Sequence, residues 1–586
     1  MIAHRLRGPS AVFLALFALT GIWLLSGLAG EASPVFANPG TLHVAATGVD
    51  NNLCSSSQPC RTLQHAVDLA LSGDTIKVAA GQYTGVSSRS NPYEGGTVTQ
   101  VVYISKTVVI RGGYTSSFSE PPDPVANATI FNAQQQGRVF HIFGDIAPTL
   151  EGVRITDGQA LTGTYYGGGV YIRLAQAHIS QCWIYNNAAQ FGGGGIWLES
   201  SPSIVSNSTI YANTANDGGG VYFNQSDNAQ LVGSTVFTNT ADHYGGGVYL
   251  SYSASRIDAN TIISNSAVES GGGLFANNSA AQVNHNKIAA NYADYSGGGL
   301  YLSQSTARVN SNVIVSNAAA QDGGGVYLYF SAGDSLTSNT IAGNIVGREG
   351  GGGFIGGGVA TLNGNAILAN QADYGGGFSM WDSSTSFNGN QVLSNTATHD
   401  GGAFYLTSGN IVTMTNMIIA DNQITNGQGS GLYIAGSVAT LLHTTLARNT
   451  GSSGRGLYLT EGGLPAVYTT VTLTNSIIVN QAVGVFVDSG STARLESTLW
   501  NSNGVDTGGA GMINLANNYT GNPLFAVDGY HILTGSAAID KGVNTGLNVD
   551  IDPEPRPYLA PDLGADEYWP PDALHKVYLP VALKIP

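Results

Sequence analysis

The feature that most constrains this chain is a glycine cluster that returns at nearly even intervals. Most clusters read Gly-Gly-Gly and are followed by an apolar residue and then an aromatic one. The clusters end at Gly169, Gly195, Gly220, Gly247, Gly273, Gly299, Gly325, Gly353, Gly377, Ala403, Gly431 and Gly456. Successive positions in this series are 24 to 28 residues apart. Such a period predicts a solenoid, because one unit of this size cannot bury a core alone and must stack on its neighbours.

The content of one unit predicts the kind of solenoid. Between Gly297 and Gly323, three apolar stretches, Leu300–Leu302, Ala307–Val309 and Val313–Val315, are separated by Ser, Asn, Gly and Asp. Stretches this short and rich in Val, Ile and Tyr are typical of strands rather than helices. We therefore expect an all-β parallel β-helix with three short strands per turn and about 26 residues per turn. Each strand would pair with its equivalent one turn later, about 4.8 Å away.

Two series of asparagines keep the same period. One consists of Asn187, Asn213, Asn239, Asn265, Asn291, Asn317, Asn344, Asn370, Asn395, Asn422 and Asn449, and the other of Asn260, Asn286, Asn312, Asn339, Asn365, Asn390 and Asn416. Asparagine favours turns, and stacked side-chain amides can form ladders. We expect both series to be structural ladders at the corners of the turns.

These repeats resemble those of secreted bacterial right-handed parallel β-helix proteins of the pectin-lyase-like class. The Gly-Gly-Gly-Val-Tyr and Ile-x-x-Asn elements are also similar to repeats of polymorphic outer-membrane proteins, which usually have Ala where this chain has a third Gly, except at Ala403. The flanking segments Thr41–Thr84, Asn522–Phe525, Ser536–Gly542 and Pro561–Glu567 resemble the opening cap and closing domain of such proteins. The resemblance implies a right-handed helix but no particular activity, because one scaffold carries many functions.

The expected organisation has five parts. They are a signal peptide or N-terminal anchor at 1–37, an N-terminal cap with the first strands at 38–96, the parallel β-helix at 97–500, a C-terminal closing domain at 501–568, and a Pro-rich linker with a short tail at 569–586. The tail residues Val577–Leu583 are compatible with a sorting signal and with a plain edge strand.

The N-terminus predicts export. His4, Arg5 and Arg7 precede an apolar run at 11–28, and Ala37 ends a small-residue cleavage site. An uncleaved anchor helix is the alternative, because about 20 apolar residues span a bilayer. The protein is therefore expected to be secreted or held at the cell surface.

The net charge of the chain limits the classes of binding partner. The formal net charge is −16, with only 21 Lys and Arg, which disfavours nucleic acid and anionic membrane surfaces. We expect a monomer that contacts no membrane beyond the N-terminal anchor and binds an extracellular polysaccharide or cell-surface glycan.

Three cysteines occur in a chain expected to be exported. Cys54 and Cys60 lie in a Ser-rich loop and are predicted to form a disulfide, since a zinc site would need more ligands than the neighbourhood offers. Cys182 lies beside Trp183 in a predicted strand and is expected to be a buried, inert thiol.

An acidic residue precedes most glycine clusters. The series is Asp217, Asp242, Glu269, Asp294, Asp322, Glu349, Asp373 and Asp400. On stacked turns these carboxylates would form a column that repels itself or takes up cations, which makes calcium the candidate cofactor at Asp242, Glu269, Asp294 and Asp322. The alternative is that the acids form turns ahead of the glycines. No other cofactor is expected.

An aromatic series lies next to the acids. It comprises Tyr171, Trp197, Tyr222, Tyr249, Phe275, Tyr301, Tyr327, Tyr405, Tyr433 and Tyr458, with breaks expected at Ile355 and Ser379. Strand alternation places the aliphatic neighbours inside and these rings outside. An exposed aromatic stripe usually marks a binding site, so Tyr222, Tyr249, Phe275, Tyr301 and Tyr327 are predicted to bind glycan. The alternative is that the rings only stack on one another.

The function predicted from the sequence is therefore that of an exported structural or adhesive module that binds carbohydrate. The alternative is a polysaccharide lyase or glycoside hydrolase, which would need a base with calcium or a pair of carboxylates. No catalytic residue can be named, and the repeats vary too little in length to build a cleft from inserted loops.

Overall fold

The computed structural model describes residues 40–50, 53–90, 96–161, 165–463 and 466–570, and all structural statements below concern these residues. The chain divides into Met1–Asn38 and a second unit, Pro39–Pro586. The expected signal segment at 1–37 and the tail at 577–583 lie outside the described residues. Within the described part, no helix combines the length and hydropathy that a membrane crossing requires.

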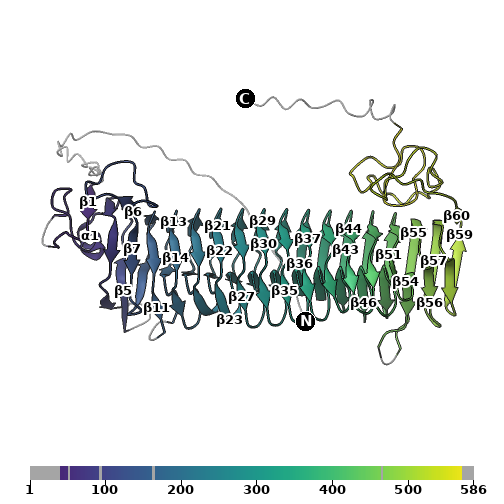
Figure 1. The fold of residues 1–586 in the computed structure, drawn as a ribbon, viewed down its shortest axis with the longest axis horizontal. Helices are drawn as coiled ribbons and strands as arrows, with labels where there is room; N and C mark the ends of the chain where they lie inside the picture. The colour runs from purple at the N-terminus through teal and green to yellow at the C-terminus, as the bar shows by residue number, and fades with distance from the viewer. Residues whose placement is uncertain (1–39, 51–52, 91–95, 162–164, 464–465, 571–586) are drawn as a thin grey trace, which may run out of the picture. The chain divides into compact units, whose positions relative to one another are not determined.

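The second unit is built of stacked coils (Figure 1). A typical coil consists of β32 (Leu300–Ser303), β33 (Arg308–Asn310), β34 (Val313–Val315) and the two-residue β35 (Ala318–Ala319). Each strand pairs in parallel with its equivalent in the next coil, as Tyr301 pairs with Tyr327 and Val309 with Leu336. The predicted all-β parallel β-helix with three strands per turn is confirmed, and the short fourth strand is an addition that the sequence did not suggest.

Four columns of strands run along the stack: the first contains β32, the second β33, the third β34 and the fourth, short column β35. The first column contains β5 (Thr97–Ile104), β8 (Arg138–Phe143), β12 (Val170–Arg173), β16 (Ile196–Glu199), β20 (Val221–Asn224), β24 (Val248–Ser251), β28 (Leu274–Asn277), β32, β36 (Val326–Thr337), β39 (Gly353–Asn363), β42 (Phe378–Trp381), β46 (Phe404–Thr407), β50 (Leu432–Ala435), β54 (Arg455–Thr460) and β56 (Val483–Val487). The short column runs from β11 (Gln159–Ala160) through β15 (Ala188–Ala189), β19 (Thr214–Asp217), β23 (Thr240–Tyr244), β27 (Ser266–Ala267) and β31 (Tyr292–Ala293) to β53 (Thr450–Gly451).

The core fills the inside of the coils. In β20, Val221 and Phe223 are fully buried in the main hydrophobic cluster, whereas Tyr222 belongs to a separate aromatic cluster on the other side of the strand. The same alternation holds in β24, where Val248 and Leu250 face the core and Tyr249 does not. The two-residue period of a strand therefore sets the direction of the side chains in these strands.

The glycine triplets are required where coils turn from the short column into the first. Gly245 has φ +66°, a conformation that disfavours other residues, and a Cβ on Gly246 would lie 2.2 Å from the Ser266 carbonyl oxygen of the next coil. Any larger side chain at Gly246 would push adjacent coils apart.

Asparagine ladders tie the coils together at two corners. The Asn291 Nδ2 atom donates to Asn317 Oδ1 at 3.0 Å, and Asn317 Nδ2 donates to Asn344 Oδ1 at 3.1 Å. The first series is bonded in this way from Asn187 to Asn449, and the second from Asn260 to Asn390. The expectation was wrong for Asn416, because Gln391 pairs with Ile418 and the ladder position after Asn390 therefore falls on Met417.

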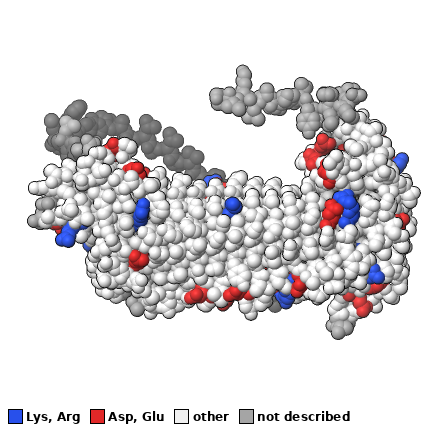
Figure 2. Space-filling model, viewed as in Figure 1, with Lys and Arg blue, Asp and Glu red and all other residues white. Residues whose placement is uncertain are grey.

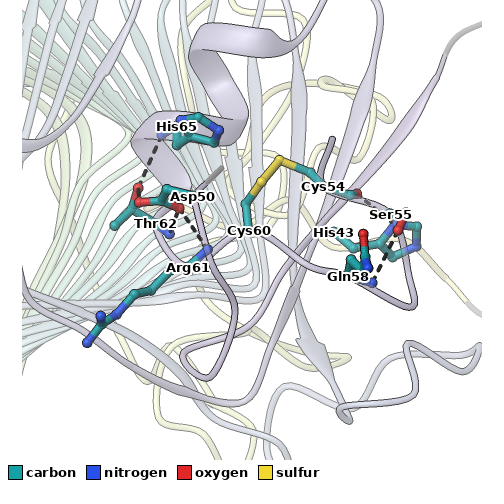
Figure 3. Close-up of a disulfide and its surroundings, with 9 residues drawn as sticks. All are labelled: His43, Asp50, Cys54, Ser55, Gln58, Cys60, Arg61, Thr62 and His65. Atoms are coloured by element: carbon teal, nitrogen blue, oxygen red, sulfur yellow. Dashed lines mark hydrogen bonds between the residues drawn. A yellow bond between two sulfur atoms is a disulfide. The ribbon is translucent and has the colours of Figure 1, made fainter. Parts of the chain in front are cut away.

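The N-terminal end of the core is covered by α1 (Leu63–Leu69), whose Leu63, Ala66 and Val67 are buried in the main cluster. Thr62 caps this helix by accepting from the His65 amide at 3.3 Å. Cys54 and Cys60 form a disulfide beside it, with both residues buried (Figure 3). Cys182 is a free, buried cysteine, and burial raises the pKa of its thiol to about 12.

The coils extend past the boundary expected at residue 500. Strands β58 (Val505–Gly509), β59 (Met512–Ala516) and β60 (Tyr519–Thr520) pair with β56 and β57 (Thr492–Asn501). The following segment, 521–570, packs on the outer side of the third column rather than continuing the stack (Figure 1). Its Leu563 and Ala565 share a buried cluster with Ile477 and Leu499.

Candidate functional site

The outward rings of the first column form an unbroken ladder over most of the stack. From β5 to β39 the register places Tyr103, His141, Tyr171, Trp197, Tyr222, Tyr249, Phe275, Tyr301, Tyr327 and Phe354 over one another. Neighbouring ring centroids lie 4.5 Å apart for Tyr222 and Tyr249 and 4.6 Å apart for Tyr301 and Tyr327. This sequence of rings is called the aromatic ladder below.

The aromatic ladder was expected to break at two positions, and one of these two predictions was wrong. The equivalent of Tyr327 is Phe354 rather than Ile355, because the last glycine of the cluster, Gly353, pairs with Val326 inside the strand. A ring is therefore present at this position. The break at Ser379 is real, and its hydroxyl donates to Glu349 Oε2 at 2.7 Å.

The expectation that these rings are exposed was also wrong. Tyr222 is 9% exposed, Tyr249 7%, Phe275 6% and Tyr327 9%, and Tyr301 is half-buried. The rings point away from the core, but each is covered by its neighbours in the ladder and by the loop that precedes the glycine triplet. Stacking between coils, which was the structural alternative, therefore accounts for most of the area of each ring.

Two hollows nevertheless open over the ladder. The first, of about 470 Å³, is lined by Tyr166, Phe191, Trp197, Glu199, Asp217, Tyr222 and Asn224. The second, of about 590 Å³, is lined by Tyr244, Tyr249, Glu269, Ser270, Phe275, Asn277, Tyr295, Tyr301, Ser303 and Tyr329. They lie on consecutive coils, because Asp217 pairs with Tyr244 and Tyr222 with Tyr249. These two hollows together are called the ladder groove.

The ladder supplies the floor of the groove and other aromatic residues supply its walls. Tyr295 is 55% exposed, Phe191 40% and Tyr329 36%. Tyr244 packs against the Phe275 ring at 4.8 Å. Sequence reasoning missed these wall residues, although most of them share one signal: an aromatic residue within the few positions before a glycine triplet.

Two carboxylates give the groove its charge. Asp217, at the end of β19, has an Oδ1 atom that is buried without a hydrogen-bond partner among the described residues, and burial raises the pKa of this carboxyl to about 6. The negative charge of Glu269 acts in the same direction. A hydrogen bond with the Glu269 carboxylate raises the pKa of Tyr244 to about 12.

A third carboxylate in the groove is already paired. Glu199 Oε2 accepts from the Tyr171 hydroxyl at 3.0 Å, and Arg173 Nε lies 3.5 Å from Glu199 Oε1.

The structure does not bring the predicted calcium ligands into one column. Asp322 pairs with Ser296 and Glu349 immediately before the triplets, whereas Glu269 lies one position and Asp242 and Asp294 two positions earlier in their coils. Asp322 is ion-paired with Arg348. Within the described part of the chain, none of the four belongs to a group of three or more potential metal ligands. The drift in position before the glycines is what separates these carboxylates.

Another group of potential metal ligands does come together, in a different part of the structure. His531, Asp552 and Asp566 lie within 4.8 Å of one another in the segment 521–570. The two ring nitrogens of His531 already lie 2.5 Å from Asp528 and Asp552 carboxylate oxygens, and the hydrogen bond to Asp552 raises the pKa of His531 to about 10. This geometry is that of a protonated imidazole holding two loops together.

Another hollow, of about 620 Å³, lies at the N-terminal cap between α1 and β3 (Gly81–Tyr83). Its carboxylates are used by the protein itself. Asp50 accepts from the Arg61 and Thr62 amides and the Thr62 hydroxyl (Figure 3), and Asp68 is ion-paired with Arg89. Tyr83 and Phe131 also line this hollow, but among the described residues neither Asp50 nor Asp68 has a buried oxygen without a partner, as Asp217 does in the ladder groove.

Acidic side chains are concentrated along one edge of the coils. In Figure 2, red Asp and Glu atoms follow the lower edge, where Figure 1 places β23 and β27, while charged residues are sparse over the middle coils.

On the side formed by the second column, Arg256 Nη2 lies 2.6 Å from Asp258 Oδ2, and His285 lies 3.0 Å from the other Asp258 oxygen. The Asp258 carboxylate thus has two side-chain partners.

The similarities of this chain to known proteins are similarities of fold. The family model described as the right-handed β-helix region matches residues 125–314. No curated protein matches the sequence. Among solved structures, the chain is similar to pectate lyase Pel9A (12% identity, 91% of this chain and 97% of that chain covered, TM-score 0.25). It is also similar to a mutant tailspike protein of E. coli bacteriophage HK620 in complex with a pentasaccharide (13% identity, 80% and 78% covered, TM-score 0.31).

Identities and TM-scores this low carry no argument about ligand or activity. The coil pairing, together with the family-model match over residues 125–314, shows the fold of a right-handed parallel β-helix.

Proposed function

We propose that the protein is an exported structural or adhesive module that binds an extended glycan along the ladder groove. The observation that carries the proposal is the pair of hollows on consecutive coils, which have an aromatic floor, exposed aromatic walls and polar groups at the rim. Pockets lined by aromatic side chains with a few placed polar groups are typical ligand sites.

The geometry of the coils fits a polymer rather than a compact ligand. Equivalent residues repeat about every 4.8 Å along the stack, which is close to the length of one pyranose unit in an extended chain. A glycan lying along the axis would therefore meet similar surroundings at each sugar. Its apolar ring faces would pack on Tyr295 and Tyr329, and its hydroxyls would reach Asn277, Ser303 and Glu269.

Retention on immobilised polysaccharides tests this proposal. Tyr295→Ala with Tyr329→Ala removes two exposed walls and should abolish retention while leaving the melting temperature nearly unchanged. The control is Tyr252→Ala, which removes a ring that is 60% exposed outside both hollows and should leave retention intact. Equal retention of the double variant and the control would refute glycan binding in the ladder groove.

Substitution in the floor is a weaker test. Tyr249, Tyr301 and Tyr327 are stacked between coils, so replacing them with Ala would leave gaps in the ladder and lower stability as well as binding. Export is checked separately by locating the full chain in a producing cell. Assaying reducing ends and ultraviolet absorbance after incubation with the retained polymer distinguishes a binding module from a lyase or hydrolase.

A further inference from the structure

The charge of the ladder groove narrows the glycan that it would take. Among the described residues, no lysine or arginine lines either hollow, and the carboxylates are Glu199, Asp217 and Glu269. Glu199 is held by Arg173 and the Tyr171 hydroxyl, so Asp217 and Glu269 carry the charge available to a ligand. Polyuronates, which bring their own negative charge, would be repelled here.

Asp217 is poorly satisfied by the protein itself. It is half-buried at the floor of the first hollow, and its Oδ1 atom accepts no hydrogen bond among the described residues. Burying a carboxylate without a partner is unfavourable, and its ordinary remedies are protonation or a cationic partner. Burial raises the pKa of Asp217 to about 6, so the carboxylate still carries its charge at neutral pH and a cationic partner is the remedy that remains.

The aromatic walls favour the same kind of partner. An ammonium group is attracted to the faces of aromatic rings, and Phe191, which is 40% exposed, lines the hollow that contains Asp217. In the second hollow, Glu269 stands among Tyr244, Tyr249 and Tyr295. Each hollow thus pairs one available carboxylate with aromatic surfaces.

We infer that the ladder groove selects an amine-bearing glycan, a chain of β-linked amino sugars with free ammonium groups, through Asp217 and Glu269. The inference rests on the proposed glycan-binding function and adds its specificity. The two carboxylates contact consecutive stretches of the same chain, because Asp217 pairs with Tyr244 and Tyr244 with Ser270, the neighbour of Glu269.

The test compares three probes of matched length by calorimetry at neutral pH and low salt: a β-linked glucosamine oligomer, the corresponding N-acetylglucosamine oligomer, and oligolysine. The glucosamine oligomer should bind about tenfold more tightly than the acetylated one, the ratio that roughly 1.4 kcal/mol of charge interaction gives. Oligolysine should bind more weakly than either sugar, because it lacks the flat ring faces that the aromatic walls take.

Charge-neutral variants complete the test. Asp217→Asn with Glu269→Gln should reduce binding of the glucosamine oligomer to that of the acetylated one and leave the acetylated one unchanged. Asp242→Asn is the matched control, since Asp242 is exposed nearby on β23 but lines neither hollow, and it should alter neither affinity.

The outcomes separate the two proposals. Equal binding of the two sugar oligomers overturns the selection for amines and leaves glycan binding standing. If oligolysine binds as tightly as the glucosamine oligomer, the groove recognises charge alone and the inference fails. If neither sugar oligomer binds, the proposed function fails with it.

Discussion

Asp334 is a buried carboxylate at a corner where the coils before and after have Ala307 and Ala360. It is 0% exposed, and its Oδ1 atom accepts from the Ser305 hydroxyl at 2.8 Å and the Ala307 amide at 2.6 Å. Its Oδ2 atom makes no hydrogen bond among the described residues.

Replacing Asp334 with Asn should stabilise the protein at neutral pH. Burial raises the pKa of Asp334 in the folded state, so its contribution is most favourable below the unfolded pKa of about 3.9 and is lost as pH rises. An amide keeps the accepting oxygen and removes the charge, which gives a gain of roughly 1 kcal/mol at neutral pH. Urea unfolding at several pH values measures it. A gain that fails to shrink toward acid pH would contradict this explanation.

At the same scale, the aromatic ladder shows what a local pattern can and cannot predict. The alternation in Gly-Val-Tyr-Leu correctly predicted that Tyr249 points away from the core. It could not predict that Phe275 and the loop at Tyr244 cover the ring, because exposure depends on the next coil and on a turn whose conformation alternation does not fix.

Asparagine corners are the elements that lock one coil to the next. Asn317 accepts from the Asn291 amide at 3.0 Å and the Asn291 side chain at 3.0 Å, and it donates to the Ile288 carbonyl at 3.0 Å and to Asn344. Its side chain thus satisfies groups in the coils before and after its own.

Asn317→Ala should therefore cost about 3 kcal/mol, because several buried polar groups lose their partners together. Thr306→Ala in the same coil is the control, since Thr306 is exposed, and it should change stability by less than about 0.5 kcal/mol. Guanidinium denaturation compares the two. Equal effects would mean that the ladder is incidental to stability.

The strands themselves could be predicted from the sequence and the short column could not. Val and Ile at regular spacing identify β33 and β34, whereas β35 is only Ala318–Ala319, a pair that no propensity marks as a strand. The prediction of a single acidic column was wrong for a related reason. A drift of one or two residues before the glycines is invisible to a period count but moves a carboxylate to another part of the turn.

At the scale of the whole molecule, the segment 521–570 packs on the third column through apolar residues and is held together internally by a network of charged residues. Burial raises the pKa values of Asp550 and Asp562 to about 7 and of Asp566 to about 6, and His531 is raised to about 10 by its bond to Asp552. Arg556 lies 3.3 Å from Glu567 within this network.

This internal network should weaken as pH rises. The raised carboxyl pKa values give stability that is greatest below about 4 and declines up to about 7. The raised His531 pKa gives stability that is present below 6.5 and lost on approach to about 10. Hydrogen exchange, corrected for intrinsic rates, should show 521–570 opening with rising pH while β32 to β34 stay protected. His531→Gln should remove the alkaline part of this dependence. Uniform protection at all pH values would contradict it.

The central claim is that equivalent residues of consecutive coils form one continuous groove for a polymer. The direct measurement is affinity as a function of oligosaccharide length, determined by calorimetry for glucosamine oligomers from two sugars upward. The account predicts that affinity increases with each added sugar until the groove from Phe191 to Tyr329 is filled and then stays constant. An affinity that is independent of length would show that no such groove binds the chain.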